Sequence, residues 1–383
     1  MPSTRKSVPL HGSERTQPHG AKPVGEAPPQ ERVHVTLVLR PHPSKKEFSE
    51  KEWSSSHPLK RKYLTREEFE ARHGADPQDF AKVEDFAREH GLTIMEKDAA
   101  RRAIVLTGTS AKVSAAFGVR RLRYEHPSGS YCGHSGPVHI PSELAGIVRG
   151  VLGLDDRPQA KRSPLRQPLE PRAAARGQDA LLTPPQLARL YNFPEGFDGQ
   201  GQCIALIELG GGYRHQDLVA YFKQLALPLP KVSAVSVHGV FNNPEGHTSS
   251  SDNEVVGDIE VVGGIAPGAS FVVYFASNTD QGFFHAVTKA IHDKQYKPNI
   301  LSISWGDSEC AWTPLTRRLM NEALQEAAGM GVTIFCAAGD WGSSNGVPGD
   351  TQHVMFPASS PYVIACGGTS IVVEGDRIVK ETV

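Results

Sequence analysis

Beyond Thr183 the chain alternates between short apolar runs and longer stretches with helical spacing, and this alternation constrains the fold more than any other feature. The apolar runs contain almost no polar residues, so each is expected to be a strand buried on both faces. We predict strands at 204–209, 270–275, 300–305, 332–337 and 363–366, and helices at 216–225, 253–263, 282–292 and 317–329. This order predicts an α/β fold, a parallel sheet with helices on both faces.

The carboxyl ends of the strands in such a sheet are where ligands bind. Glu208, Trp305 and Asp340 stand at or just after the ends of three predicted strands. We therefore expect these three side chains to lie near a functional site.

Residues 32–153 show a different order of elements. Strand patterns at 32–40, 92–96, 103–107 and 120–124 are interleaved with helical patterns at 80–90 and 110–117. Thr65 and Glu68 have the spacing of a capping box, which marks the start of a helix. The order βαββαβ predicts an α+β domain of the ferredoxin-like type.

Two segments lack apolar rhythm. Residues 1–31 are rich in Pro, Gly, His and charge, which predicts a disordered leader. Residues 154–182 repeat Pro and Arg, which predicts an exposed linker open to proteolysis. The predicted order is thus the leader, the domain at 32–153, the linker, and the α/β domain at 183–383.

Charge and cysteine content exclude several classes of partner. With 41 Lys and Arg against 42 Asp and Glu, the net charge of -1 creates no field that attracts nucleic acid or an anionic membrane. No apolar run approaches the length of a membrane span, and no secretory signal is readable at the start. The 5 cysteines have no metal-binding spacing and are expected to be buried thiols.

Glu254 and Asp258 are four residues apart in a stretch with helical spacing, so both carboxylates should project from one helical face. Neighbouring carboxylates raise each other's affinity for a proton, which suits one of them to act as a general base in acid. A solvated helix face that carries two acids is the structural alternative.

Five segments, taken in order, resemble the sedolisin family of serine-carboxyl peptidases: IALIELGGGY, EVVGDIEVVGGIAPGA, YFASNTDQGF, NILSISWG and ASSPYVIACGGTS. The resemblance implies a subtilisin-like catalytic domain and a ferredoxin-like activation domain that acts as an intramolecular inhibitor. It also implies that Glu254 is the general base for the nucleophilic serine and that Asp258 supports it. Asp340 matches the family's oxyanion-hole aspartate, although Trp341 replaces the usual small serine beside it.

By the same resemblance, Glu208 and Trp305 belong to a hydrogen-bond network behind the base, and Ser304, Trp305 and Gly306 form the edge that pairs with an extended peptide or protein substrate. Processing is expected between about Arg172 and Leu182. The resemblance further implies an extracellular monomer that works in acid. The family's calcium site would lie beyond Val383, so no metal site is expected in this chain.

The family's nucleophile motif, Gly-Thr-Ser-Ala-x-x-Pro, does not occur in the sequence. Ser370 follows Gly368 and Thr369, but the apolar Ile371 comes next, so it is interpreted as the end of a strand. The chain alone is therefore expected to be inactive. Two alternatives stay open: a non-catalytic peptide-binding or inhibitory protein on a truncated peptidase scaffold, and a phosphate-binding turn at 210–212.

Overall fold

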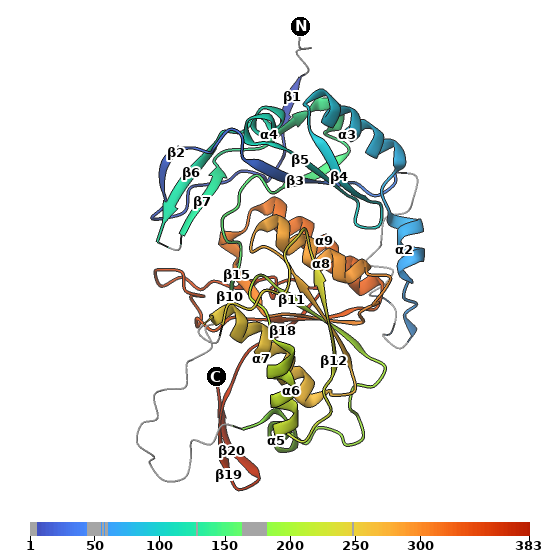
Figure 1. Cartoon of the computed structure of the whole chain (residues 1–383), viewed down its shortest axis with the longest axis vertical. Helices are drawn as coiled ribbons and strands as arrows, with labels where there is room; N and C mark the ends of the chain where they lie inside the picture. Colours follow the sequence, from blue (N-terminus) through green and yellow to red (C-terminus); the bar gives the residue numbers. More distant parts are fainter. Residues whose placement is uncertain are drawn as a thin grey trace. The chain divides into compact units, whose positions relative to one another are not determined.

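The computed structural model describes residues 6–43, 55, 57, 60–127, 129–162, 182–246 and 249–383. The chain forms two compact units (Figure 1). Unit 1 contains residues 1–160, 277–295 and 308–332, and unit 2 contains residues 161–276, 296–307 and 333–383. Two segments from the second half of the sequence therefore belong to the same unit as the first 160 residues.

Unit 1 is built on a four-stranded antiparallel sheet with the order β4-β5-β3-β9. Its strands are β3 (Arg32–Leu39), β4 (Thr93–Asp98), β5 (Ala103–Thr109) and β9 (Val148–Leu152). Helices α2 (Arg66–His73) and α3 (Pro77–Glu89) connect β3 to β4, and α4 (Ser110–Phe117) follows β5. This is the strand order of a ferredoxin-like domain.

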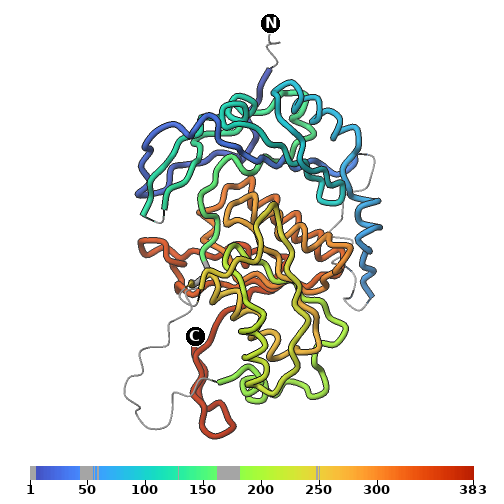
Figure 2. Tube along the Cα trace, viewed as in Figure 1, coloured from blue at the N-terminus to red at the C-terminus, as the bar shows by residue number. Residues whose placement is uncertain are grey.

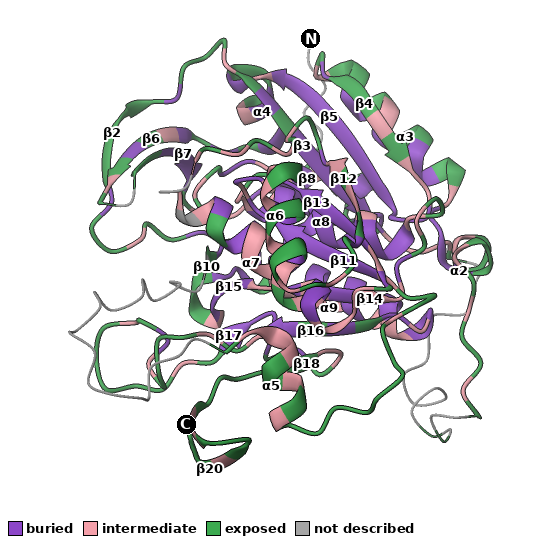
Figure 3. Cartoon of the chain, turned by 60° about the horizontal axis from the view of Figure 1, so that its bottom comes forward, coloured by how far each residue is buried: buried purple, intermediate pink, exposed green. Residues whose placement is uncertain are grey.

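Local sequence signals define the helix ends of this domain. The Thr65–Glu68 capping box begins α2 as predicted, and Asp76 caps α3 just before a proline. Gly118 ends α4 at φ 59°, a left-handed conformation that suits glycine. Figure 3 shows β5 as a continuous buried strand, and its residues Ile104 and Leu106 are almost fully buried.

Two predictions for this region were wrong. The strand near 120–124 exists as β6 (Arg121–His126), but it pairs with β2 (Lys22–Glu26) and β7 (Gly129–His134) in a separate sheet. The fourth strand of the main sheet is β9. The leader is also ordered where it is described, because β2 pairs with β6 and β1 (Ser7–Pro9) pairs with β8 (His139–Pro141).

Unit 1 also contains two helices from the later sequence, α8 (Asp280–His292) and α9 (Pro314–Gly329), and the short helices η2 (Ser142–Leu144) and η3 (Glu309–Ala311). Thr279 and Thr313 cap α8 and α9 through their hydroxyls. Among the helices in the described ranges, none is both long and apolar enough to cross a lipid bilayer.

Unit 2 is built on a six-stranded parallel sheet with the order β12-β13-β11-β14-β16-β18. Its strands are β11 (Cys203–Glu208), β12 (Lys231–Ser236), β13 (Ser270–Phe275), β14 (Ile300–Ile303), β16 (Thr333–Ala337) and β18 (Ile364–Cys366). Helices α6 (His215–Gln224) and α7 (Ser250–Ile265) pack on it through an apolar core that includes Phe222, Val255 and Phe271. The predicted parallel α/β sheet is confirmed.

Smaller elements complete unit 2. Helix α5 (Pro184–Leu190) precedes the sheet, and β10 (Lys161–Arg162), β15 (Trp305–Ser308) and β17 (Met355–Phe356) form a three-stranded sheet. The hairpin β19 (Ser370–Glu374) and β20 (Arg377–Thr382), drawn in red in Figure 2, contacts α5 where Tyr191 Oη donates to Glu381 Oε1 at 2.7 Å. Ser370 is exposed and is the first residue of a strand, not the last residue of one as predicted. The predicted processing segment at 172–182 lies almost wholly outside the described residues.

Candidate active site

Three carboxyl side chains interact near the carboxyl edge of the parallel sheet in unit 2. Glu208 ends β11 and is 0% exposed, and Glu254 on α7 is 7% exposed. Asp258 follows Glu254 by one helical turn. Burial raises the pKa of Glu208 well above its usual range, and the charges of Asp258 and Glu254 raise it further. The two acids on α7 are therefore not a solvated helix face.

Asp258 is held by the hydroxyl of Ser304, which donates to its two carboxylate oxygens at 3.1 and 2.9 Å. Burial raises the pKa of Asp258 to about 6, and the bond from Ser304 acts in the opposite direction. A carboxyl group with such a pKa exchanges its proton in mildly acidic solution. Sequence reasoning placed Ser304 on the substrate edge and missed its bond to Asp258.

Glu208 accepts a hydrogen bond from the Trp305 indole, with 3.1 Å between Nε1 and Oε2. Its other oxygen has no hydrogen-bond partner among the described residues. A buried carboxyl with one bonded oxygen favours its neutral form. Because Ser304 and Trp305 are consecutive, one short segment supports two of the three acids.

Asp340 is exposed and lies three residues beyond β16. In the sheet β16 pairs with β14, and β14 pairs with β11, so the segments that carry Asp340, Ser304 and Glu208 leave the sheet at the same edge. Trp341 is 45% exposed, and its ring lies 3.5 Å from the position that a Cβ on Gly346 would take. The ring therefore packs against the loop that contains Gly346.

The segment expected to bind substrate already carries a paired strand. β10 runs antiparallel to β15, with Lys161 opposite Gly306 and Arg162 opposite Trp305. β10 comes from the predicted linker, and sequence reasoning missed it because two residues are too short for a period-2 pattern to be recognised.

The glycine turn at 210–212 does not present a free phosphate site. The amide of Gly212 donates to Asp252 Oδ1 at 2.8 Å, and Asp252 is itself buried. A carboxylate thus takes the place that a phosphate would need. Gly211, at φ 71°, approaches the α7 backbone so closely that a Cβ would lie 2.6 Å from the carbonyl carbon of Ser251. These glycines serve close packing.

One group among the described residues could hold a metal ion, formed by Glu31, Cys132 and Asp156 in unit 1. The Arg121 guanidinium lies 3.6 Å from Glu31 and 4.0 Å from Asp156. The amide of Cys132 also donates to Asp156 Oδ1 at 2.6 Å. Because the Arg121 cation is already present and a thiol is a poor ligand for calcium, we interpret this group as an ion-paired cluster.

The cysteines were predicted to be buried thiols. Contrary to this prediction, Cys310 and Cys366 are exposed.

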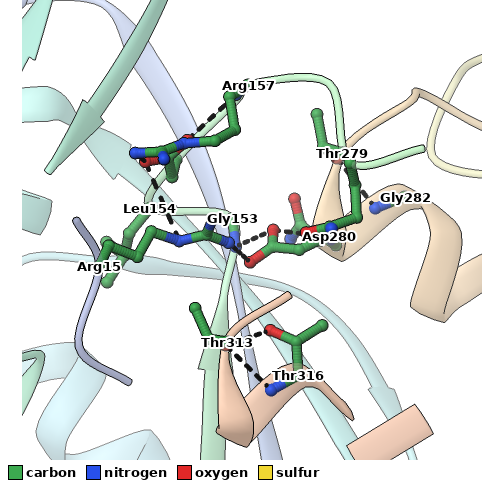
Figure 4. A network of polar contacts seen from close by, with 12 residues as sticks. Arg15, Gly153, Leu154, Arg157, Thr279, Asp280, Gly282, Thr313 and Thr316 are labelled. Carbon is green, nitrogen blue, oxygen red and sulfur yellow. Dashed lines mark hydrogen bonds and ion pairs between the residues drawn. The ribbon is translucent and has the colours of Figure 1, made fainter. Parts of the chain in front are cut away.

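A polar network in unit 1 joins the first 160 residues to α8 (Figure 4). Arg15 donates to Asp280 at 2.7 Å, and the Gly153 amide donates to the same carboxylate at 3.3 Å. Asp155 pairs with Arg157 at 2.6 Å and lies 3.9 Å from Arg15. The two arginine charges hold the pKa of Asp155 below its usual range in spite of burial. The network resists separation of α8 from the ferredoxin-like domain.

The chain matches two family models, the "Pro-kumamolisin, activation domain" over residues 19–157 and the "Subtilase family" over residues 238–378. It is 45% identical to kumamolisin of Bacillus sp. (strain MN-32) over 379 residues, which cover 98% of this chain and 69% of that protein. It is 26% identical to tripeptidyl-peptidase sed5 of Aspergillus fumigatus over 393 residues, 95% of this chain and 66% of that protein. It is 25% identical to sedolisin of Pseudomonas sp. (strain 101) over 373 residues, 93% of this chain and 63% of that protein. The chain thus spans about two thirds of the length of these relatives.

Proposed function

Because the chain belongs to the sedolisin family of serine-carboxyl peptidases, we propose that it is the precursor part of an endopeptidase that cleaves peptide bonds at acidic pH through a Ser-Glu-Asp mechanism. The observation that carries this proposal is a set of three interacting carboxyl groups, those of Glu208, Glu254 and Asp258. Ser304 donates a hydrogen bond to Asp258, and Trp305 donates one to Glu208. An imidazole base would be protonated in acid, whereas a carboxylate still accepts a proton there.

In the proposed reaction, Glu254 takes the proton of a serine hydroxyl as the serine oxygen attacks the substrate carbonyl carbon. Asp258 keeps the Glu254 carboxylate oriented, and Asp340 in its protonated form donates a hydrogen bond to the developing oxyanion. Glu254 then passes the proton to the departing amine, and water hydrolyses the acyl-enzyme by the same proton transfers. The family's serine motif is absent from these 383 residues. We therefore propose that these residues alone do not hydrolyse peptides.

The partners follow from the same argument. Peptides or proteins are the proposed substrates, and residues 32–153 are the proposed intramolecular inhibitor, with processing in the segment after β10. The pairing of β10 with β15 supports an inhibited precursor, because this segment of the linker after residues 32–153 lies on the proposed substrate strand and excludes substrate. A monomeric, extracellular enzyme that binds calcium beyond Val383 is proposed on the family resemblance alone.

Glu254→Gln tests the mechanism in the full-length precursor, including any residues that follow Val383. We expect loss of self-processing at acidic pH, because the amide cannot accept the serine proton, while the Tm stays within a few degrees of wild type. Glu260→Gln, on the same helix, is the matched control and should process normally. Normal maturation of Glu254→Gln would reject the assigned base and favour the peptide-binding alternative.

A further inference from the structure

The contact between β10 and β15 includes a charged side-chain pair as well as backbone pairing. Lys161 stands opposite Gly306, and its Nζ lies 3.0 Å from Oδ1 of Asp307, the next residue on β15. The Asp307 side chain is 11% exposed, whereas that of Lys161 is 53% exposed. The acid is therefore largely buried on β15, whereas the lysine is half exposed and comes from the predicted linker.

A largely buried carboxylate is stable only with a counter-charge or with hydrogen bonds. In the precursor Lys161 supplies a charge. When the linker leaves β15, a substrate that takes its place puts another residue opposite Gly306. A basic residue there restores the ion pair. A neutral residue does not restore it, and an acidic residue adds a like charge.

We infer that Asp307 is a specificity-determining residue, which selects Lys or Arg at the substrate position that pairs with Gly306. The inference rests on the proposed peptidase function and adds to it one preferred residue type at one position. In the precursor, Lys161 of the linker then occupies the position of that substrate residue. Arg162, its neighbour, stands opposite Trp305 in the same pairing.

The test is a set of fluorogenic peptides in which a single Lys moves along the residues before the cleaved bond, assayed with self-processed enzyme. We expect kcat/KM to rise about threefold to fivefold when the Lys reaches one position, relative to Gln there. Asp307→Asn should remove that preference and leave cleavage of the Gln peptide unchanged. Asp307→Lys should reverse it in favour of Glu.

Glu309→Gln is the matched control, because Glu309 is the next acid along the chain and pairs with Arg317 at 3.1 Å. It should keep the preference for Lys. An equal loss on both peptides in Asp307→Asn would show a structural role and overturn the inference, as would a wild-type enzyme without preference at any position.

A second measurement does not depend on hydrolysis. In the intact precursor, Asp307→Asn and Lys161→Gln should each speed hydrogen exchange of the amides at 161 and 162, and the double variant should exceed neither single variant. If the enzyme hydrolyses no peptide but the double variant exceeds neither single variant in exchange rate, the peptidase proposal is rejected and the contact between Asp307 and Lys161 is supported. Additive exchange effects would reject Asp307 as the group that recognises Lys161.

Discussion

At the scale of single residues, the bond from Ser304 to Asp258 predicts a change in pH dependence. The hydroxyl donates to the charged carboxylate and so holds the pKa of Asp258 down. In Ser304→Ala this support is lost, so the pKa should rise from about 6. We expect the acidic limb of the kcat/KM profile to move up by about one pH unit.

The measurement is a pH–rate profile of the processed enzyme from pH 3 to 7. Ser302→Ala is the control, because Ser302 lies two residues earlier, in β14, and the hydroxyl that bonds Asp258 in the structure is that of Ser304. An unshifted limb in Ser304→Ala would contradict the assigned titration of Asp258.

The sequence predicted the acids of the site but not most of their bonds. The spacing of four residues between Glu254 and Asp258 is a local pattern in the sequence of α7. The bond from Trp305 to Glu208 joins residues 97 positions apart, and it depends on the register in which Ile207 pairs with Ile303. A one-residue slip would turn these side chains to the other face, and no local pattern reveals that register.

At the scale of elements, Glu326 on α9 links three segments of unit 1. It is buried, pairs with the Arg102 guanidinium, and bonds to His292 of α8 at 3.1 Å. Arg102 and His292 hold its pKa below the usual range despite burial. We expect Glu326→Gln to cost about 3 kcal/mol of unfolding free energy, because Arg102 would be left buried without its counter-charge.

Urea denaturation of the precursor at pH 7 measures this cost. Glu322→Gln is the matched control, one turn earlier on α9, where Glu322 pairs with the more exposed Arg149 at 2.7 Å. That substitution should cost less than about 1 kcal/mol. Equal effects of the two substitutions would show that Glu326 does not hold the elements together.

Helical spacing predicted that α8 and α9 exist but not which element their buried polar groups meet. His285 on α8 is fully buried, with its Nε2 2.6 Å from the Thr36 hydroxyl of β3. Its hydrogen-bond partner lies 249 positions away, so the sequence around His285 does not reveal this bond. In the same way, the strand at 121–126 has the correct pattern, but its sheet was wrong because pairing partners are not encoded locally.

At the scale of the whole molecule, the parallel α/β sheet followed from the order of elements, because connection rules leave few topologies. The ferredoxin-like type was also predicted, but the fourth strand of its sheet is β9 and not the strand near 120–124. The sequence did not predict that 277–295 and 308–332 join unit 1. That assignment depends on side-chain contacts such as Arg15 with Asp280 and Arg102 with Glu326, which form only after both partners have folded.

The two units should respond to acid in opposite directions near their titrating groups. In unit 2, burial raises the pKa of Asp258 to about 6 and that of Glu260 to about 7. An acid whose pKa rises on folding stabilises the fold at low pH, and this stabilisation is lost as pH rises from about 4 to 7. In unit 1, burial lowers the pKa of His134 to about 4. The contribution of His134 to the free energy of unfolding is therefore fully present above pH 6.5, and it falls by up to about 3 kcal/mol as the pH drops to 4.

Hydrogen exchange of the precursor, corrected for intrinsic rates, tests this difference. Acidification from pH 7 to 4 should slow exchange in β11 of unit 2 and speed it in β7 of unit 1, which contains His134. Glu260→Gln should flatten the first response, and His134→Gln should flatten the second. Burial raises the pKa of Asp280 in unit 1, so Asp280 stabilises unit 1 at low pH whereas His134 destabilises it. For this reason exchange is measured in individual strands and not over the whole unit. Parallel responses of β7 and β11 would contradict the assignment, whereas opposite responses would mean that acid loosens the proposed inhibitor while it stabilises the proposed catalytic unit.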